Sequence, residues 1–398
     1  MLNKLIKPLT IIFFICILVF NFKLNEGHFS QLANSFLEGK TYFLEEPEGG
    51  WIDTTPSRDH NFWPAGPFPI ILLTPFVFIF KFFKLFFYQG YLQPLLVIIV
   101  FWFCFKVAKS YKYSDNDAGF LAYAFCFSTV FINVALWPAA WGFSQVVAVL
   151  ILWLIIFGFI KKTSYWLMGI LVGLAMATRF ASFGVIILIL ADIFWFSKKN
   201  INVKLKQSLS FITPLIFLIS LICLYNYVRF GNILDNGYAG QILTNENLEK
   251  ARSYGLFSLI HIPGNLYYFL LSTPLPVIKD SISHVLTFPF IRANPWGMSI
   301  LVTSPYFIYL FFLGYKDKLS KILILTIIVI SIPIFLYYGI GFRQFGYRYS
   351  LDFLPILFFL LMRNYRKKYI SLSYGFKSVV IMTSITNIYF FLTAFMYP

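Results

Sequence analysis

The stretch that decides the fold is Phe143-Ser-Gln-Val-Val-Ala-Val-Leu-Ile-Leu-Trp-Leu-Ile-Ile-Phe-Gly-Phe-Ile160, in which no side chain is charged. As a helix it would rise about 27 Å, close to the thickness of the hydrocarbon layer of a bilayer. The recurrence of such runs predicts an all-α polytopic membrane protein, with one integral membrane domain over residues 1–398 and roughly 11–13 transmembrane helices. The apolar runs lie at roughly 9–22, 66–87, 91–105, 118–136, 143–160, 165–178, 182–196, 208–228, 257–278, 299–314, 322–340, 350–362 and 376–396.

The composition leaves no room for a large soluble domain. Of the 398 residues 59% are hydrophobic and 12% are charged, whereas soluble domains carry about 25% charged residues. The mean hydropathy of +0.76 also excludes disorder. The cysteines lie inside apolar runs without a CxxC pair or a nearby histidine, so we expect buried hydrophobes and neither a disulfide scaffold nor a zinc site. They are Cys16, Cys104, Cys126 and Cys223.

The charge pattern predicts which loops face the cytoplasm. The 32 basic residues exceed the 16 acidic ones by 16, and they cluster in short segments between the apolar runs. By the positive-inside rule we expect the segments 198–206, 316–321 and 363–368 inside, and residues 229–298 as the second large outer region. The basic excess is then a topology signal, and nucleic acid is not expected as a partner.

The N-terminal part of the chain leaves one ambiguity. Lys4 and Lys7 precede the apolar run 9–22 and no small-residue cleavage site follows, which favours an uncleaved first helix with a cytoplasmic N-terminus. The acidic loop 23–63 is then outside, and the lysines of 106–112 look inside, yet two apolar segments lie between them. Either one of these segments is re-entrant, or the lysines face out.

The first outer loop, residues 23–63, differs from the rest of the chain in its charge. It holds seven acidic residues against three basic ones. The apolar residues of 29–37 recur at the spacing of an amphipathic helix, and Gly39 follows as a candidate C-cap. Because such a helix lies along the membrane surface, we predict an interfacial helix on the outer face.

Glu26 is the first candidate for chemistry, because it follows the first span and lies beside His28 at the start of the interfacial helix. A carboxylate at the membrane face can take the proton of an acceptor hydroxyl. In the alternative interpretation Asn25 caps the helix and Glu26 only complements the helix dipole.

A dense polar segment, Gly341-Phe-Arg-Gln-Phe-Gly-Tyr-Arg-Tyr-Ser-Leu-Asp352, lies at the outer mouth of a late span. Its Arg343, Tyr347 and Arg348 suit a phosphate, because a guanidinium binds phosphate oxygens through two parallel hydrogen bonds. Snorkelling arginines within an aromatic belt are the alternative. We also expect Asp352 to pair with Arg348.

Other polar residues are weaker candidates for substrate binding. Arg179 is flanked by apolar residues on both sides, and an arginine inside the membrane is a functional candidate by default. Arg229 begins a glycine-containing turn, and Asp53, Asp59 and His60 form a polar group near the end of the first outer loop. Snorkelling, turn chemistry and solvation are the alternatives for these residues.

In their order these pieces resemble the GT-C superfamily of polytopic glycosyltransferases, which use polyprenyl-phosphate sugars. The similarity covers the chain in outline through short motifs, and it looks closest to bacterial and archaeal members without a large C-terminal soluble domain. The motifs are Glu26-Gly-His-Phe-Ser-Gln-Leu-Ala-Asn-Ser-Phe-Leu-Glu-Gly-Lys-Thr-Tyr-Phe43, Trp63-Pro-Ala-Gly-Pro-Phe-Pro69, Thr178-Arg179 and Gly346-Tyr-Arg-Tyr-Ser-Leu-Asp-Phe-Leu-Pro355.

The resemblance implies an enzyme in the cytoplasmic membrane of a prokaryote that transfers a sugar from a polyprenyl-phosphate donor to an acceptor on the outer face. It implies that Glu26 is the catalytic carboxylate and that Arg348, with Arg343, holds the lipid phosphate. Many members have a further acid at the second outer turn, which here reads Trp137-Pro-Ala-Ala-Trp-Gly-Phe-Ser-Gln145 and has none. The sequence therefore supports no metal site, and no other cofactor is expected.

Two other classes of function stay open. A transporter or flippase of a lipid-linked saccharide would bind with the same arginines but need no base, and internal inverted repeats would favour it. A non-catalytic membrane scaffold would need neither the binding arginines nor a catalytic base. The absence of a Walker loop, a dinucleotide fingerprint, an HExxH motif and a Ser/His/Asp set argues against an ATP-driven machine or a metalloprotease. A common outer cavity for Glu26 and Arg348 would favour the transferase.

Overall fold

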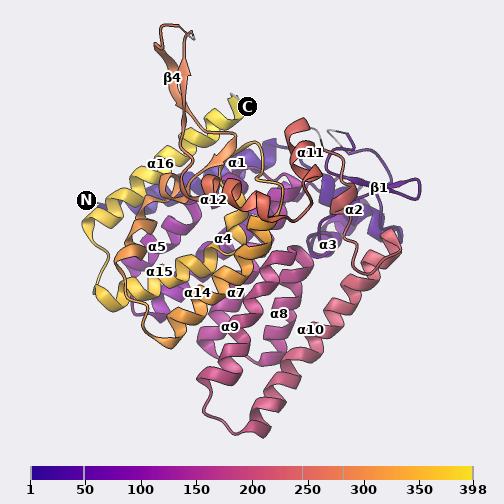
Figure 1. Ribbon diagram of the computed structural model, residues 1–398, viewed down its shortest axis with the longest axis horizontal. Helices are drawn as coiled ribbons and strands as arrows, with labels where there is room; N and C mark the ends of the chain where they lie inside the picture. Colours follow the sequence, from indigo (N-terminus) through magenta and orange to yellow (C-terminus); the bar gives the residue numbers. More distant parts are fainter. Residues whose placement is uncertain (1, 48–49, 244, 281, 397–398) are drawn as a thin grey trace.

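The structure, a computed structural model, describes residues 2–47, 50–243, 245–280 and 282–396, which form an almost entirely helical bundle (Figure 1). Short 3₁₀ and π segments extend several helices, among them η1 (Gln89–Tyr91), η2 (Phe180–Val185), η3 (Asp192–Phe196), η6 (Pro305–Phe312) and η7 (Arg348–Asp352). The α-helices are α1 (Leu2–Lys23), α2 (His28–Leu37), α3 (Phe68–Phe82), α4 (Gln93–Ser110), α5 (Asp115–Phe127), α6 (Phe131–Leu136), α7 (Ala140–Lys161), α8 (Tyr165–Thr178), α9 (Ile186–Ala191), α10 (Ile201–Phe230), α11 (Glu246–Ser253), α12 (Ile262–Leu270), α13 (Ile300–Thr303), α14 (Lys318–Leu336), α15 (Leu354–Lys368) and α16 (Tyr374–Met396).

The strands of the described residues form three small two-stranded sheets. Two of them are antiparallel hairpins, and the third joins two distant segments in parallel. The pairs are β1 (Thr55–Ser57) with β2 (His60–Phe62), β3 (Leu275–Ile278) with β4 (Leu286–Arg292), and β5 (Trp296–Met298) with β6 (Gln344–Gly346).

Helices of membrane-spanning length and hydropathy make up the bundle, which confirms the predicted all-α polytopic membrane fold. In α7, 78% of the most apolar window is buried, because this helix is hydrophobic around its whole circumference and lies among other helices. Within the described residues six helices are long and apolar enough to cross: Leu2–Lys23, Gln89–Ser110, Ala140–Lys161, Ile201–Phe230, Lys318–Leu336 and Tyr374–Phe395.

Broken helices cover further apolar runs. The predicted segment 118–136 is covered by α5 and α6, which are separated at residues 128–130. The two short runs that meet at Arg179 form two helical segments, α8 and the helical stretch Phe180–Phe196. Within the described residues six helices have full spanning length, and the number of passes that the shorter segments add stays a prediction.

The apolar run 66–87 does not cross the membrane, and this resolves the N-terminal ambiguity. In the last turn of α3, Lys81 Nζ lies 2.9 Å from Glu38 Oε1, just after α2. The chain then reaches the start of α2, where Gln89 Oε1 accepts a hydrogen bond from the Phe29 N–H. Both ends of α3 therefore lie at the same end of the bundle as α2, so α3 does not traverse it; on the predicted orientation this makes α3 the re-entrant segment and places the lysines at the end of α4 inside.

The apolar run 257–278 also stays at one end of the bundle. It contains the short helix α12 and then enters strand β3. Asn265 of α12 donates through Nδ2 to the carbonyl oxygens of Phe335 (3.0 Å) and Tyr337 (2.9 Å), at the end of α14. This run therefore stays at the end of the bundle where α14 ends, and the outer location of residues 229–298 stays a prediction.

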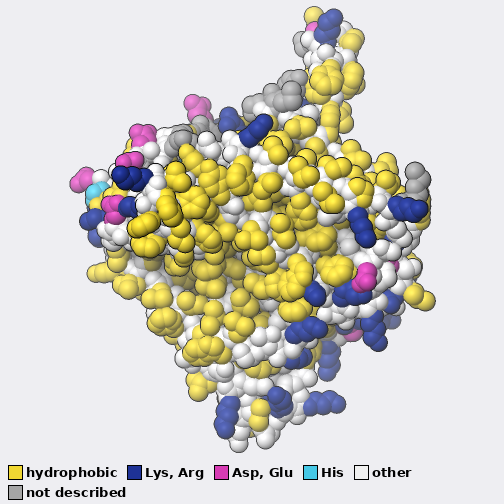
Figure 2. Space-filling model, turned by 180° about the vertical axis from the view of Figure 1, so that it is seen from behind, with side chains coloured by type: hydrophobic (Ala, Val, Ile, Leu, Met, Phe, Trp, Pro, Cys, Tyr) yellow, Lys and Arg dark blue, Asp and Glu magenta, His cyan; other side chains and the backbone are white. Residues whose placement is uncertain are grey.

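The predicted amphipathic helix is present as α2, and its place at the membrane surface stays a prediction. It buries Phe29, Leu32 and Ala33, and the chain turns at Gly39 with a φ of 71°. The N–H of Lys40 donates back to the Ser35 carbonyl (2.9 Å), which closes the helix end. Figure 2 shows one face of the molecule: on it many Lys and Arg side chains gather at the lower end and right edge, a broad apolar surface covers the middle, and acidic side chains gather mostly at the upper left.

Candidate functional site

A cavity of about 700 Å³ lies at the outer end of the bundle. Its walls come from the first outer loop, the turn before α7 and the start of that helix, the start of η2, the region after α10, the end of α14 and the segment 337–352. Segments from the whole length of the chain thus surround one space. Among the predicted site residues, Glu26, Asp53, Arg179, Arg343 and Arg348 line it.

Glu26 faces this cavity with a fixed carboxylate. Trp137 Nε1 donates to Glu26 Oε1 (2.8 Å), and His28 Nδ1 lies 3.8 Å from Oε2. The expected cap of α2 by Asn25 is wrong, because the N-cap residue is Gly27 and it makes no side-chain capping bond. Glu26 therefore lies ahead of the helix, and its carboxylate is held by a tryptophan from the turn before α7.

His28 adds little charge to this part of the site. Its imidazole is largely shielded from solvent and packs against the ring of Trp63, with ring centroids 5.4 Å apart. Burial lowers the pKa of His28 to about 4. The ring is therefore neutral near neutral pH, and it does not neutralise the Glu26 carboxylate there.

Arg348 presents a buried guanidinium to the same cavity. The residue is 7% exposed, and within the described chain no carboxylate lies within ion-pair distance of it. Its guanidinium lies over the rings of Trp141 (4.1 Å) and Tyr349 (4.7 Å), and its Nε has no hydrogen-bond acceptor. A buried cation without a direct ion pair is costly, so this environment favours a further anion in the cavity.

The backbone around Arg348 is fixed from two sides. Gln145 Nε2 donates to the Arg348 carbonyl (3.0 Å), and β6 pairs in parallel with β5 two residues earlier. Arg343 lines the cavity nearby as an exposed residue with a φ of 52°, in a turn that begins at Gly341. Arg348 is thus preset in position, while Arg343 lies at the rim.

Arg179 and Asp352 form a bidentate ion pair, so the expected pair of Asp352 with Arg348 is wrong. Arg179 donates through Nε (2.5 Å) and Nη2 (2.9 Å) to the two carboxylate oxygens. Asp352 is 1% exposed. The pair joins the end of α8 to η7, which carries Arg348 at its first position.

Asp53 lies in the cavity wall near Arg348. Burial raises the pKa of Asp53, while the positive charge of Arg348 and a hydrogen bond from Gln241 lower it. Gln241 Nε2 lies 3.1 Å from Asp53 Oδ1. This carboxylate therefore belongs to the same electrostatic unit as the guanidinium of Arg348.

The remaining predicted residues do not line the cavity. Tyr347 is buried and donates from its hydroxyl to Asn265 Oδ1 (2.8 Å). Asp59 and His60 lie at the exposed tip of the β1–β2 hairpin. Arg229 is 1% exposed and donates to the carbonyl of Trp63 (2.5 Å), so it packs α10 against the first outer loop.

The turn 137–145 contributes residues to which the sequence alone assigns no role. Trp137 holds Glu26, Trp141 lies under Arg348, and Gln145 fixes the Arg348 backbone. The spacing of four residues between Trp141 and Gln145 is the available signal, since such residues share one side of a helix start, whereas Trp137 precedes that helix.

The donor set around the cavity does not fit a divalent cation. Within the described residues no group of three or more His, Cys, Asp or Glu side chains lies close enough to hold a metal ion. The turn 137–145 presents tryptophan rings and amide groups where an acid would be needed. We therefore derive no step through a metal.

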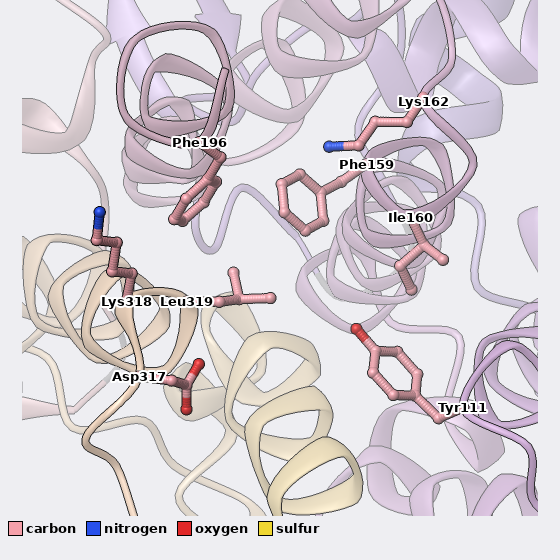
Figure 3. A pocket seen from close by; sticks show the side chains of 8 residues that line it. All are labelled: Tyr111, Phe159, Ile160, Lys162, Phe196, Asp317, Lys318 and Leu319. Carbon is pink, nitrogen blue, oxygen red and sulfur yellow. The ribbon is translucent and has the colours of Figure 1, made fainter. Parts of the chain in front are cut away.

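A second cavity, of about 430 Å³, lies at the inner end of the bundle (Figure 3). The rings of Phe159 and Phe196 face each other across it, and Asp317 lies at its lower edge. Asp317 pairs with Arg363 (2.8 Å) and Lys367 (2.7 Å). Because this carboxylate is already neutralised, the inner cavity offers no base for catalysis.

No family model and no curated protein sequence matches this chain. Among solved structures, the chain is similar to the apo form of the oligosaccharyltransferase of Archaeoglobus fulgidus, with a TM-score of 0.44 and 11% sequence identity. The similarity covers 96% of this chain and 55% of that one, so the chain spans about half the length of that protein. A likeness of this degree carries no argument about activity, which is judged from the site itself.

Proposed function

We propose that this protein is a membrane glycosyltransferase that moves a sugar from a polyprenyl-phosphate donor to an acceptor at the outer face of a prokaryotic cytoplasmic membrane. One observation carries the proposal: Glu26 and Arg348 line the same outer cavity. A scaffold has no need for a carboxylate and an unpaired guanidinium in one cavity. The sequence motifs that resemble the GT-C superfamily point to the same chemistry.

In the proposed reaction the acceptor hydroxyl attacks the anomeric carbon of the donor sugar. The new C–O bond forms as the bond between that carbon and the phosphate oxygen breaks on the opposite face, so the configuration inverts. Glu26 takes the hydroxyl proton as general base. The electron pair of the broken bond stays on the lipid phosphate.

Arg348 stabilises the leaving group in this reaction. Negative charge grows on the phosphate as the bond to the sugar breaks, and a fixed guanidinium favours that change. Its position against Trp141 and Tyr349 holds it in place, and no carboxylate of the described residues lies within ion-pair distance of it. Arg343 at the rim adds a second positive charge on the path of the phosphate. We leave Tyr347, Asp59, His60 and Arg229 out of the proposed site because they do not line the cavity.

The test is a transfer assay with the purified protein in liposomes that contain polyprenyl-phosphate sugars. We expect release of free polyprenyl phosphate by the wild type, and normal binding without release by Glu26→Gln. The flippase is the main competitor, because it would move the intact donor between leaflets without breaking a bond. Movement of intact donor that is unaffected by Glu26→Gln, with no released phosphate, would overturn the proposal in favour of transport.

A further inference from the structure

The β3–β4 hairpin projects from the body of the protein on its outer side (Figure 1). Large apolar side chains are exposed along both strands and the connecting turn. Among them are Ile282, which is 90% exposed, and Phe288, which is 70% exposed. The others are Ile278, Val285, Leu286, Phe290 and Ile291.

This hairpin is poorly suited to water. A two-stranded sheet alone is at best marginally stable in water, and here most of its apolar side chains have no protein contact that covers them. The hydrocarbon core is equally unsuitable, because the outer edge of each strand carries N–H and C=O groups that need hydrogen-bond partners. The layer of lipid headgroups meets both requirements, since it covers apolar side chains and still supplies water and polar groups.

The root of the hairpin is fixed beside a membrane-spanning helix. The Tyr389 hydroxyl of α16 donates to the Ile291 carbonyl (2.7 Å), and the Ala293 N–H donates to Thr393 Oγ1 (3.1 Å). The exposed face of α16 is apolar as well, with Met382 at 66% and Leu392 at 41% exposure. The apolar surface that meets lipid along α16 is therefore continuous with the apolar surface of the hairpin.

We propose that the β3–β4 hairpin lies in the headgroup layer of the outer leaflet and binds the lipid surface. Its polar turn residues, including Lys279, Asp280 and His284, then contact headgroups and water, while the apolar stem faces the acyl boundary. A second copy of the chain is the competing occupant. A rigid partner would cover one side of the ribbon, whereas the exposed apolar side chains are spread over both strands and the turn.

The test places an environment-sensitive fluorophore on a cysteine at Leu286, in a variant whose four native cysteines are replaced by alanine. The same label at Asp59, on the exposed tip of the β1–β2 hairpin, is the matched control on the outer side. A third label, at Phe288, guards against misfolding of one variant. The labelled proteins are placed in nanodiscs with one copy each, and nitroxide lipids and aqueous iodide serve as quenchers.

We expect the labels at Leu286 and Phe288 to emit at shorter wavelength than the label at Asp59, and to be quenched severalfold more strongly by nitroxide lipid than by iodide. The label at Asp59 should show the reverse order. Iodide quenching at Leu286 and Phe288 as strong as at Asp59 would overturn the proposal. So would shielding from both quenchers that appears only with two copies per nanodisc, because the occupant would then be a second chain.

Discussion

The indole rings of Trp137 and Trp141 lie edge to face with their centroids 5.0 Å apart, and each ring holds one of the two charged groups of the candidate site. Trp137 donates a hydrogen bond to Glu26, and Trp141 lies beneath the guanidinium of Arg348. The spacing between the proposed base and the proposed phosphate site is therefore set by a pair of packed rings from one turn.

The first prediction concerns the base. Glu26→Gln keeps the shape of the side chain and removes its basicity, so sugar transfer should fall by about 10²–10⁴-fold while donor binding persists. Trp137→Phe should have a smaller effect, because it removes only one charge-assisted hydrogen bond, worth about 1.5–3 kcal/mol. Initial rates and a donor-binding titration measure both. Unchanged transfer in Glu26→Gln would remove this residue from the mechanism.

The second prediction concerns the phosphate. Arg348→Ala should weaken the binding of a polyprenyl phosphate by about one to two decades, and Arg348→Lys should recover only part of that loss, because an ammonium group cannot form two parallel hydrogen bonds. Arg58→Ala is the matched control, since Arg58 is exposed on the outer side and does not line the cavity. Titration of purified protein in detergent gives the affinities. Equal affinities in all variants would contradict the assignment.

The third prediction concerns the pair of Arg179 with Asp352. Because it joins α8 to η7, we expect it to position Arg348 rather than to contact substrate. Asp352→Asn leaves the partly buried Arg179 without its ion-pair partner and should cost up to about 3–5 kcal/mol of stability. The exchange Arg179→Asp with Asp352→Arg should restore part of the thermal midpoint and of the donor KM. If the double variant recovers neither the thermal midpoint nor the donor KM relative to the single variants, the ion pair does not position Arg348.

The fourth prediction follows from His28. The unfolded chain takes up a proton at this residue near pH 6.5, whereas the folded protein does so only near its pKa of about 4. Unfolding therefore gains protons between these values, and stability should fall by up to about 3 kcal/mol as the pH drops from 6.5 to 4. Thermal midpoints in detergent should fall less in His28→Asn than in the wild type. His60→Asn, at an exposed histidine, should follow the wild type, and parallel curves for all three would contradict the prediction.

The fifth prediction concerns topology. If α3 returns to the outer side, a cysteine at Lys84 should react with an impermeant reagent added outside intact cells. A cysteine at Lys112, at the end of α4, should react only after permeabilisation. Both positions are exposed, so access decides the outcome. Reaction of Lys112→Cys from outside would reverse the orientation of α4.

The sequence predicts the elements whose signal is local. The apolar period of α2 and the glycine after it are properties of a dozen neighbouring residues, and both are confirmed. The run that becomes α3 is as apolar as a membrane span. Whether it crosses the bundle or lies against α2 depends on packing between the two helices, which no local sequence pattern records. For the same reason the sequence places Asp352 near Arg348, whereas Arg179, 173 residues away along the chain, binds it.

The candidate site also contains residues that a local sequence signal reveals and residues that only the fold reveals. Charged residues at loop ends stand out in an apolar sequence, so Glu26 and Arg348 are visible at once. The tryptophans between them resemble any interfacial aromatic residues until the fold brings them together. The cavity itself depends on segments from the whole chain, and it was beyond the reach of periodicity or spacing.

The outer position of α3 has a consequence for biosynthesis. The machinery that inserts the growing chain meets, in residues 66–87, a segment with the hydropathy of a span and with Lys81 and Lys84 near its end. Its basic residues would by themselves draw that end toward the cytoplasm. Had it inserted, every later pass would run in the opposite direction. In the folded protein this end of α3 instead lies beside α2, where Lys81 contacts Glu38, and these contacts are the ones that compete with insertion of the segment.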